Sequence, residues 1–149
     1  KTFARLETLD KKYPDGTPVS VDDNAICTYV LENGALGTMT VSWTNYGTED
    51  NSTRLYCTEG VIRMYDDPEA SLIVEKRDGT VERFALDQLT SNKDQTGGKR
   101  TSTGVIDAFV DSLMNGKPSP ISGESVIPAM KAVFANERSA KEGRMVDVE

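Results

Sequence analysis

The chain has no histidine and only two cysteines among its 149 residues. Histidine is the commonest general base and the commonest transition-metal ligand, so its absence excludes the ordinary forms of serine-hydrolase and zinc chemistry. Cys27 and Cys57 form no C-x-x-C motif, and each falls in a strand-like segment. We therefore expect both to be buried, reduced thiols without chemistry, and we expect no metal site.

The sequence also lacks the glycine-rich loops that bind nucleotide phosphates. Neither G-x-G-x-x-G nor G-x-x-x-x-G-K-S/T occurs. The Gly97-Gly98-Lys99 segment lies in a polar stretch that is typical of a solvent loop. We therefore expect no cofactor-binding residue in this chain.

Long apolar runs and positive charge are both scarce. No run approaches the roughly 18 residues of a membrane-spanning helix. The net charge is −7, from 17 basic and 24 acidic side chains, and the basic residues are scattered. Nucleic acid and anionic membranes bind through a concentrated basic field, so neither is expected as a partner. These features predict a soluble protein of the cytoplasm.

The composition, 37% hydrophobic and 28% charged, fits one globular domain over residues 1–149. The chain begins at Lys1 without a methionine, and the segment from Thr2 to Leu6 already reads as a strand. A domain rarely begins within a strand, so we expect the chain to be part of a longer protein.

Residues 24–46 predict a β-hairpin, because Asn33-Gly34 is the pair favoured in a two-residue type I′ turn. With that turn, the core face consists of Ile26, Thr28, Val30, Met39, Val41 and Trp43. The opposite face consists of Cys27, Tyr29, Leu31, Thr38, Thr40 and Ser42. A threonine-rich sheet surface suits contact with another sheet, although a solvated face is the alternative. From this face we expect an oligomer interface formed by Tyr29, Thr38, Thr40 and Ser42.

The pattern then changes from strands to helices. Short strands are expected at 55–57 and 61–65, with a second hairpin at 72–86. A helical apolar period follows over 105–113, and a second helix is expected from near Ser125, with Val126, Ile127, Met130, Val133 and Phe134 on one side. Residues 145–148 read as a closing strand. This order indicates an α+β fold: an open, mostly antiparallel sheet of about six strands, with helices on one face and the other face available for oligomerisation.

Two acidic pairs, Asp22-Asp23 and Asp66-Asp67, are candidates for a Ca²⁺ site or for divided acid and base roles. Both pairs stand at strand or turn edges. Turn formation and solvation are therefore their expected roles.

Six short motifs occur in a characteristic order along the chain. They are Val21-Asp22-Asp23-Asn24-Ala25, Glu32-Asn33-Gly34-Ala35-Leu36-Gly37, Thr58-Glu59-Gly60, Phe109 to Pro118, Ser122-Gly123-Glu124, and Ser139 with Gly143-Arg144-Met145-Val146. From about Val21 to Val148 the chain resembles the C-terminal domain of the Gfo/Idh/MocA oxidoreductases (glucose-fructose oxidoreductase, inositol 2-dehydrogenase and rhizopine catabolism).

The resemblance implies a two-domain enzyme that acts on a sugar, polyol or related hydroxy compound. An N-terminal Rossmann domain would hold NAD or NADP, and residues 1–149 would bind substrate and form a homodimer or homotetramer through the open sheet. The family's E-K-P and D-x-x-x-H motifs do not occur in the chain. We therefore assign no catalytic residue, and we expect the chain alone to be inactive and to bind no cofactor.

Five residues are candidates for substrate contact. Trp43, Asn45 and Tyr46 stand at a strand end, where an aromatic platform and an amide suit a polyol. Lys99 and Arg100 lie in a loop that could close over the substrate. The alternatives are a core position for Trp43 and a solvent loop for the two basic residues.

Two further interpretations of the whole chain stay open at this point. One is a stand-alone α+β binding or scaffold module. The other is the domain of a parent that has kept the fold but lost catalysis. The sequence specifies neither the substrate nor the choice between NAD and NADP.

Overall fold

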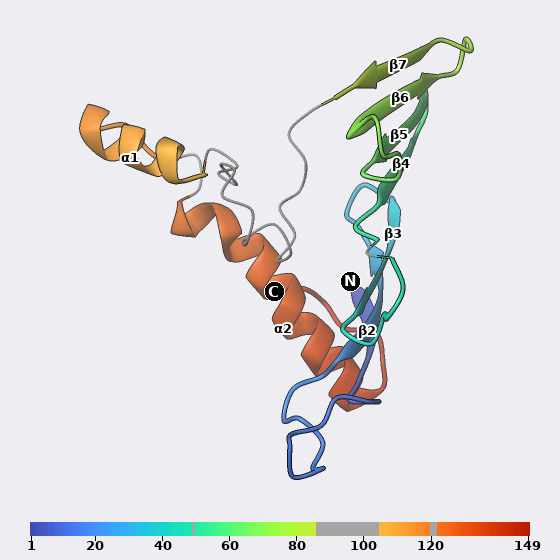
Figure 1. Ribbon diagram of the computed structural model, residues 1–149, viewed down its shortest axis with the longest axis vertical. Helices are drawn as coiled ribbons and strands as arrows, with labels where there is room; N and C mark the ends of the chain where they lie inside the picture. Colours follow the sequence, from blue (N-terminus) through green and yellow to red (C-terminus); the bar gives the residue numbers. More distant parts are fainter. Residues whose placement is uncertain (49, 86–104, 120–121) are drawn as a thin grey trace. The chain divides into compact units, whose positions relative to one another are not determined.

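The structure is a computed structural model that describes residues 1–48, 50–85, 105–119 and 122–149. The described residues form seven strands and two helices, which confirms the α+β class (Figure 1). They divide into two compact units, residues 1–47 with 120–149, and residues 48–119. The elements are β1 (Thr2–Glu7), β2 (Asn24–Val30), β3 (Leu36–Ser42), β4 (Thr53–Cys57), β5 (Gly60–Met64), β6 (Leu72–Lys76), β7 (Val81–Phe84), α1 (Val105–Asn115) and α2 (Gly123–Glu142).

The first unit is an antiparallel sheet in the order β1-β2-β3, with α2 packed along β1. The predicted strand at the start of the chain is confirmed as β1. The predicted strand at residues 145–148 is reduced to one bridge, in which Val146 exchanges two backbone hydrogen bonds of 2.9 Å with Thr2.

Helix α2 packs through small and polar residues, not through the apolar stripe that the sequence predicted. Its buried residues are Ala135, Asn136 and Ser139, and they meet Thr2 and Ala4 of β1, which are also buried. Large side chains would hold the helix further from the sheet, so the small ones permit this close packing. The predicted stripe is instead about half exposed, at Val126, Ile127, Met130, Val133 and Phe134.

Hydrogen bonds fix α2 on the sheet. The Asn136 side chain accepts from Thr2 Oγ1 at 2.6 Å and donates to the Tyr29 hydroxyl at 2.7 Å. Ser139 Oγ accepts from the Ala4 amide at 3.0 Å and donates to the Arg144 carbonyl at 2.6 Å. Buried polar groups need such partners, so each of these side chains sets the position of the helix as well as filling space.

The turn between β2 and β3 differs from the prediction. Its loop has three residues, because Leu31 donates from its amide to the Ala35 carbonyl at 2.9 Å. Gly34 has a φ of 83°, whereas Asn33 has no positive φ and instead accepts the Ala35 amide through its side chain at 3.0 Å. The type I′ prediction is therefore wrong. The loop is the three-residue kind, with glycine at its left-handed position.

This extra loop residue shifts the pairing by one position, so the residues of β2 lie on the opposite faces from those predicted, whereas those of β3 keep theirs. Cys27 pairs with Met39, and Ile26 pairs with Thr40. Tyr29 therefore lies on the helix side, where it contacts Asn136, and its predicted place on the open face is wrong. The predicted core residue Ile26 is 59% exposed. Thr38, Thr40 and Ser42 do lie on the face opposite the helix.

The second unit is an antiparallel sheet in the order β4-β5-β6-β7. The predicted hairpin at 72–86 is confirmed as β6 and β7, with Gly79 at a φ of 89° in its turn. Gly60 lies so close to β6 that an added Cβ would be 2.1 Å from the Glu75 carbonyl oxygen. The described strands thus form two sheets of three and four strands, where the sequence predicted one sheet of about six.

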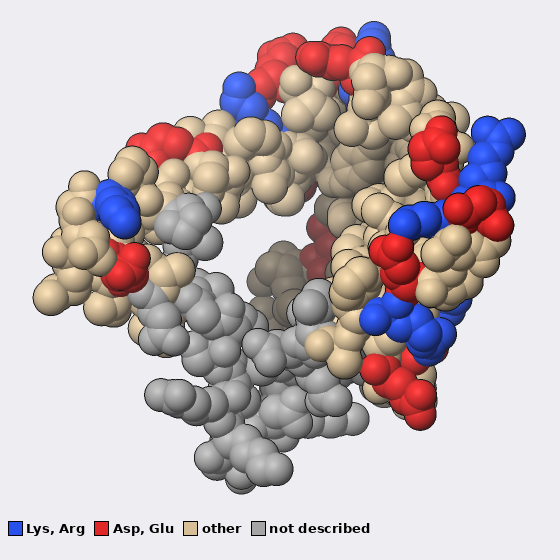
Figure 2. Space-filling view, turned by 90° about the horizontal axis from the view of Figure 1, so that it is seen from above, with Lys and Arg blue, Asp and Glu red and all other residues tan. Residues whose placement is uncertain are grey.

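Paired charges cover one side of this second sheet. The Asp66 carboxylate accepts from Arg63 Nε at 2.8 Å and from Arg54 Nε at 3.2 Å, and Arg83 bonds to Asp67 at 2.6 Å. The Arg63 guanidinium holds the pKa of Asp66 below its usual range, although burial works against this. Asp66 and Asp67 are therefore ion-paired, where solvation was expected, although Asp67 also has the expected turn role, since it accepts the Glu69 amide at 2.9 Å. Figure 2 shows Lys and Arg interspersed with Asp and Glu on the right of the view.

The two helices have capped ends. The α1 helix ends before Gly116, as predicted, and α2 ends at Gly143, which has a φ of 64°. The start of α2 is two residues earlier than predicted, because Ser122 caps it by accepting the Ser125 amide at 3.3 Å. Pro128 consequently lies inside the helix. Neither described helix is long and apolar enough to cross a membrane.

Ile73 is the fully buried residue of the second sheet, at 0% exposure. Ile73→Ala should lower the free energy of unfolding by about 2–5 kcal/mol, because it leaves a cavity. Val81→Ala, at a position that is 54% exposed in the same sheet, is the control and should cost less than about 1 kcal/mol. Urea unfolding followed by circular dichroism measures both. Equal losses in the two variants would contradict the assigned core.

Candidate functional site

One end of the first sheet collects the candidate polar and aromatic residues. Glu7 at the end of β1 pairs with Asn24 at the start of β2, and Asn24 pairs with Ser42 at the end of β3. The segment that follows β1 and the segment 43–47 therefore leave the sheet at the same end, which we call the sheet edge. Side chains from both segments meet there.

Asp23 is the anchor of this edge. Its side chain is buried, and Oδ1 accepts the Leu9 amide at 2.8 Å. Oδ2 accepts the amides of Asp10 at 2.9 Å and Lys11 at 2.8 Å. The Asp23 carbonyl accepts the Trp43 amide at 2.8 Å, so one residue holds both segments. The expected role as a solvated turn residue is wrong for Asp23.

The ionisation of Asp23 follows from these contacts. Burial alone would raise the pKa of this carboxyl. The amides of Lys11, Leu9 and Asp10, with the Asn24 side chain, outweigh that effect and hold the pKa well below its usual range. Asp23 is thus ionised near neutral pH with both of its oxygens occupied, and it is unsuited to act as a base.

Asp10, Lys11 and Tyr46 form a group that we name the Tyr46 cluster. The Tyr46 hydroxyl donates to Asp10 Oδ2 at 2.5 Å. Lys11 Nζ lies 3.4 Å from the same hydroxyl oxygen and 4.8 Å from the centroid of the ring. The Tyr46 side chain is nevertheless 73% exposed, so the cluster is open to a ligand.

Trp43 and Asn45 lie in the same segment as Tyr46. Trp43 is 61% exposed, so the alternative of a core position is wrong and its ring is accessible. Asn45 is also exposed, and its side-chain oxygen accepts the Gly47 amide at 3.1 Å. The structure therefore brings these three predicted residues to one sheet edge. Lys99 and Arg100 lie outside the described residues.

Sequence reasoning missed Asp10, Lys11 and the anchoring role of Asp23. The relevant contact joins positions 9–11 to position 23 across a loop, and no regular spacing marks it. One signal was present, since Asp23 directly precedes a predicted strand and follows a loop with few apolar residues. A buried acid at a strand start is a plausible acceptor for loop amides.

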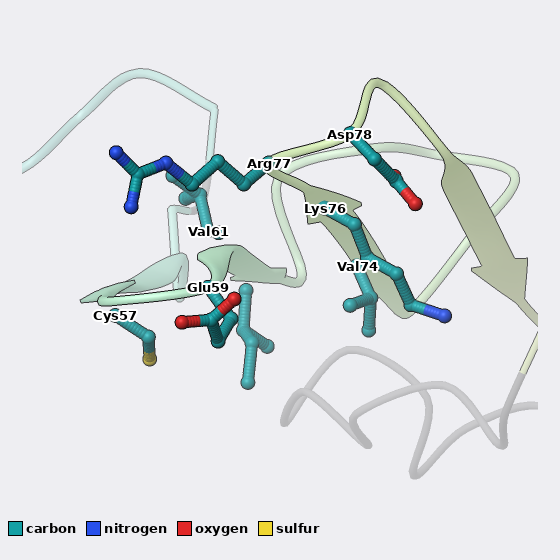
Figure 3. Close-up of a pocket in the computed structure, with 9 residues that line it drawn as sticks. Cys57, Glu59, Val61, Val74, Lys76, Arg77 and Asp78 are labelled. Atoms are coloured by element: carbon teal, nitrogen blue, oxygen red, sulfur yellow. The ribbon is translucent and has the colours of Figure 1, made fainter.

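A separate pocket of about 560 Å³ lies on the second unit (Figure 3). Val61 and Val74 line it together with acidic Glu59 and Asp78 and with basic Lys76 and Arg77. Lys76 is already paired with Glu82, and the charges of the lining are mixed. Cys57, which also lines the pocket, is exposed, so its predicted burial is wrong, whereas Cys27 is buried. Across the described residues, no group of His, Cys, Asp and Glu is arranged to hold a metal ion.

The fold matches part of several solved oxidoreductase structures. Levoglucosan dehydrogenase in complex with NADH and L-sorbose aligns with 99% of the chain at a TM-score of 0.75 and 21% identity, over 44% of its own length. An Agrobacterium radiobacter oxidoreductase in complex with NAD+, L-tartaric acid and magnesium aligns with 99% of the chain at a TM-score of 0.70 and 24% identity, over 42% of its own length. An oxidoreductase domain protein from Kribbella flavida aligns with 99% of the chain at a TM-score of 0.72 and 17% identity, over 45% of its own length.

One family model also matches part of the sequence. The GFO/IDH/MocA C-terminal domain model matches residues 1–63, which confirms the resemblance seen in the sequence over that part of the chain. No curated protein matches the chain. The chain spans less than half the length of each solved structure named above.

Replacing Asp23 tests the anchor. A carboxyl whose pKa is lower in the folded state contributes stability that is complete above its unfolded pKa of about 4 and is lost at lower pH. Asp23→Asn should therefore lower the unfolding free energy at pH 7 and flatten its dependence on pH below about 4. The exposed neighbour provides the control, Asp22→Asn, which should follow the unaltered chain. Identical urea-unfolding profiles for the two variants from pH 7 to 3 would contradict the anchor.

Proposed function

We propose that residues 1–149 are the substrate-binding and oligomerisation domain of an NAD(P)-dependent oxidoreductase. Its substrate is a sugar, a polyol or a related hydroxy compound. The observation that carries the proposal is the alignment of 99% of this chain with 42% and 44% of two proteins whose structures hold NAD+ with L-tartaric acid and NADH with L-sorbose. A Rossmann domain that precedes Lys1 holds NAD or NADP in this proposal.

The sheet edge around the Tyr46 cluster is the proposed substrate surface. Trp43 and Tyr46 supply aromatic faces for the C–H side of a polyol, and Asp10 and Asn45 supply acceptors for its hydroxyl groups. The nicotinamide supplies hydride chemistry when it is bound. The residues of this chain bind and orient the substrate, and the chain alone neither binds NAD(P) nor turns over. Lys99 and Arg100 are proposed to approach the same substrate.

The open face of the first sheet is the proposed contact with other copies. Thr38, Thr40 and Ser42 lie there beside Ile26, which is 59% exposed, and Phe3, which is 42% exposed. Mixed apolar and hydroxyl surfaces of this kind suit protein contacts, and we propose a homodimer or homotetramer. The proposed enzyme works in the cytoplasm, where Cys27 and Cys57 stay reduced.

The coding sequence upstream of Lys1 tests the two-domain proposal. We expect an open frame with a glycine-rich strand-turn-helix, an E-K-P motif and a D-x-x-x-H motif. The full-length product should then bind NADH by fluorescence titration, and residues 1–149 alone should not. A start codon at the boundary would instead leave a stand-alone α+β binding or scaffold module.

The oligomer interface can be tested by one substitution. Thr40→Arg places a long charged side chain on the open face and should reduce a dimer or tetramer to monomers while the fold is kept. Thr58→Arg, at an exposed turn of the second unit, is the control and should leave the assembly unchanged. Light scattering after size-exclusion chromatography gives the mass, and circular dichroism checks the fold. An unchanged oligomer for Thr40→Arg would overturn the assignment of this face.

A further inference from the structure

Lys11 carries the positive charge of the Tyr46 cluster, and its ammonium contacts the tyrosine. Asp10 Oδ2 accepts from the Tyr46 hydroxyl at 2.5 Å, while Lys11 Nζ lies over the Tyr46 ring and 3.4 Å from that hydroxyl. Within the described part of the chain, Lys11 forms no ion pair. Both charged side chains thus contact Tyr46, and the ammonium keeps its capacity for a further acceptor.

The backbone of Lys11, which carries this ammonium, is held in place by Asp23. Asp23 accepts the amides of Asp10 and Lys11 through one carboxylate oxygen, so both residues have a set direction from the loop. Lys11 is half-buried, whereas Asp10 and Tyr46 are exposed. A preorganised charge loses less entropy on binding than a free surface lysine does.

We propose that Lys11 makes this site selective for a polyhydroxy acid over the neutral polyol of the same length. The carboxylate of the ligand pairs with Lys11 Nζ, and its hydroxyl groups contact Asp10 and Tyr46. Asp23 acts as a positioning residue, since it touches the loop and not the ligand. This inference rests on the proposed function, because it assigns a ligand class to the same surface.

Gluconate and glucitol form a matched pair of probes, because they differ only in a carboxylate or a hydroxymethyl group at one end. Calorimetric titration of the chain at low ionic strength should give about tenfold tighter binding of gluconate, as expected for one charge-assisted contact. The preference should shrink as salt is added. Lys11→Met should remove it, because it weakens the binding of gluconate more than that of glucitol.

Lys12→Met is the control, because Lys12 is exposed, adjacent in sequence and outside the Tyr46 cluster. It should keep the preference for gluconate. Equal loss of the gluconate preference in both lysine variants would mean that it depends only on the net charge of the chain, and it would overturn the proposal. Equal weakening of both ligands by Lys11→Met would overturn it as well.

Trp43→Ala separates failure of this inference from failure of the site. If the unaltered chain binds gluconate and glucitol equally and Trp43→Ala weakens both, the carboxylate preference is overturned and the substrate surface stands. If Trp43→Ala and Tyr46→Phe change neither titration, the surface itself is wrongly placed. Absence of binding by the unaltered chain at millimolar concentrations of both probes would also overturn the inference.

Discussion

The carboxylate of Asp23 is the contact on which the candidate site depends. It gives each amide of residues 9–11 an acceptor, at the point where β2 begins. An unpaired buried carboxylate would be costly, and unpaired loop amides would be costly as well, so the two requirements satisfy each other. The loop that leaves β1 therefore has a defined course, and it presents Asp10 and Lys11 beside Tyr46.

The rest of the first unit is held together by the close approach of α2 to β1 more than by large apolar side chains. Ala4 and Ser139 let α2 lie near β1, and Asn136 bridges Thr2 and Tyr29 by hydrogen bonds. Such a core is small in apolar area, and its polar bonds define one position of the helix. This packing through small residues leaves the larger residues of α2 half exposed.

Local signals in the sequence predicted much of the fold, and distant contacts explain what it missed. The strand at Thr2, both hairpins and the two helices each have their own pattern. The sequence pattern at Asn33-Gly34 indicates a turn but defines its length less well. A single additional loop residue moved Tyr29 to the helix side. For the site, the sequence indicated Trp43, Asn45 and Tyr46 from their place at a strand end. Asp10 and Lys11 could not be found this way, because their partner Asp23 lies across a loop.

The chemistry of the edge fits a surface that binds and orients more than one that transfers protons. Asp23 is occupied by four donors, and its pKa is held too low for it to act as a base near neutral pH. Asp10 is engaged by Tyr46, and histidine is missing from the sequence. A site of this composition contributes shape, hydroxyl acceptors and one fixed positive charge. In a two-domain oxidoreductase these are the contributions that remain for the domain that does not hold the cofactor, so the local geometry and the proposed division of labour agree.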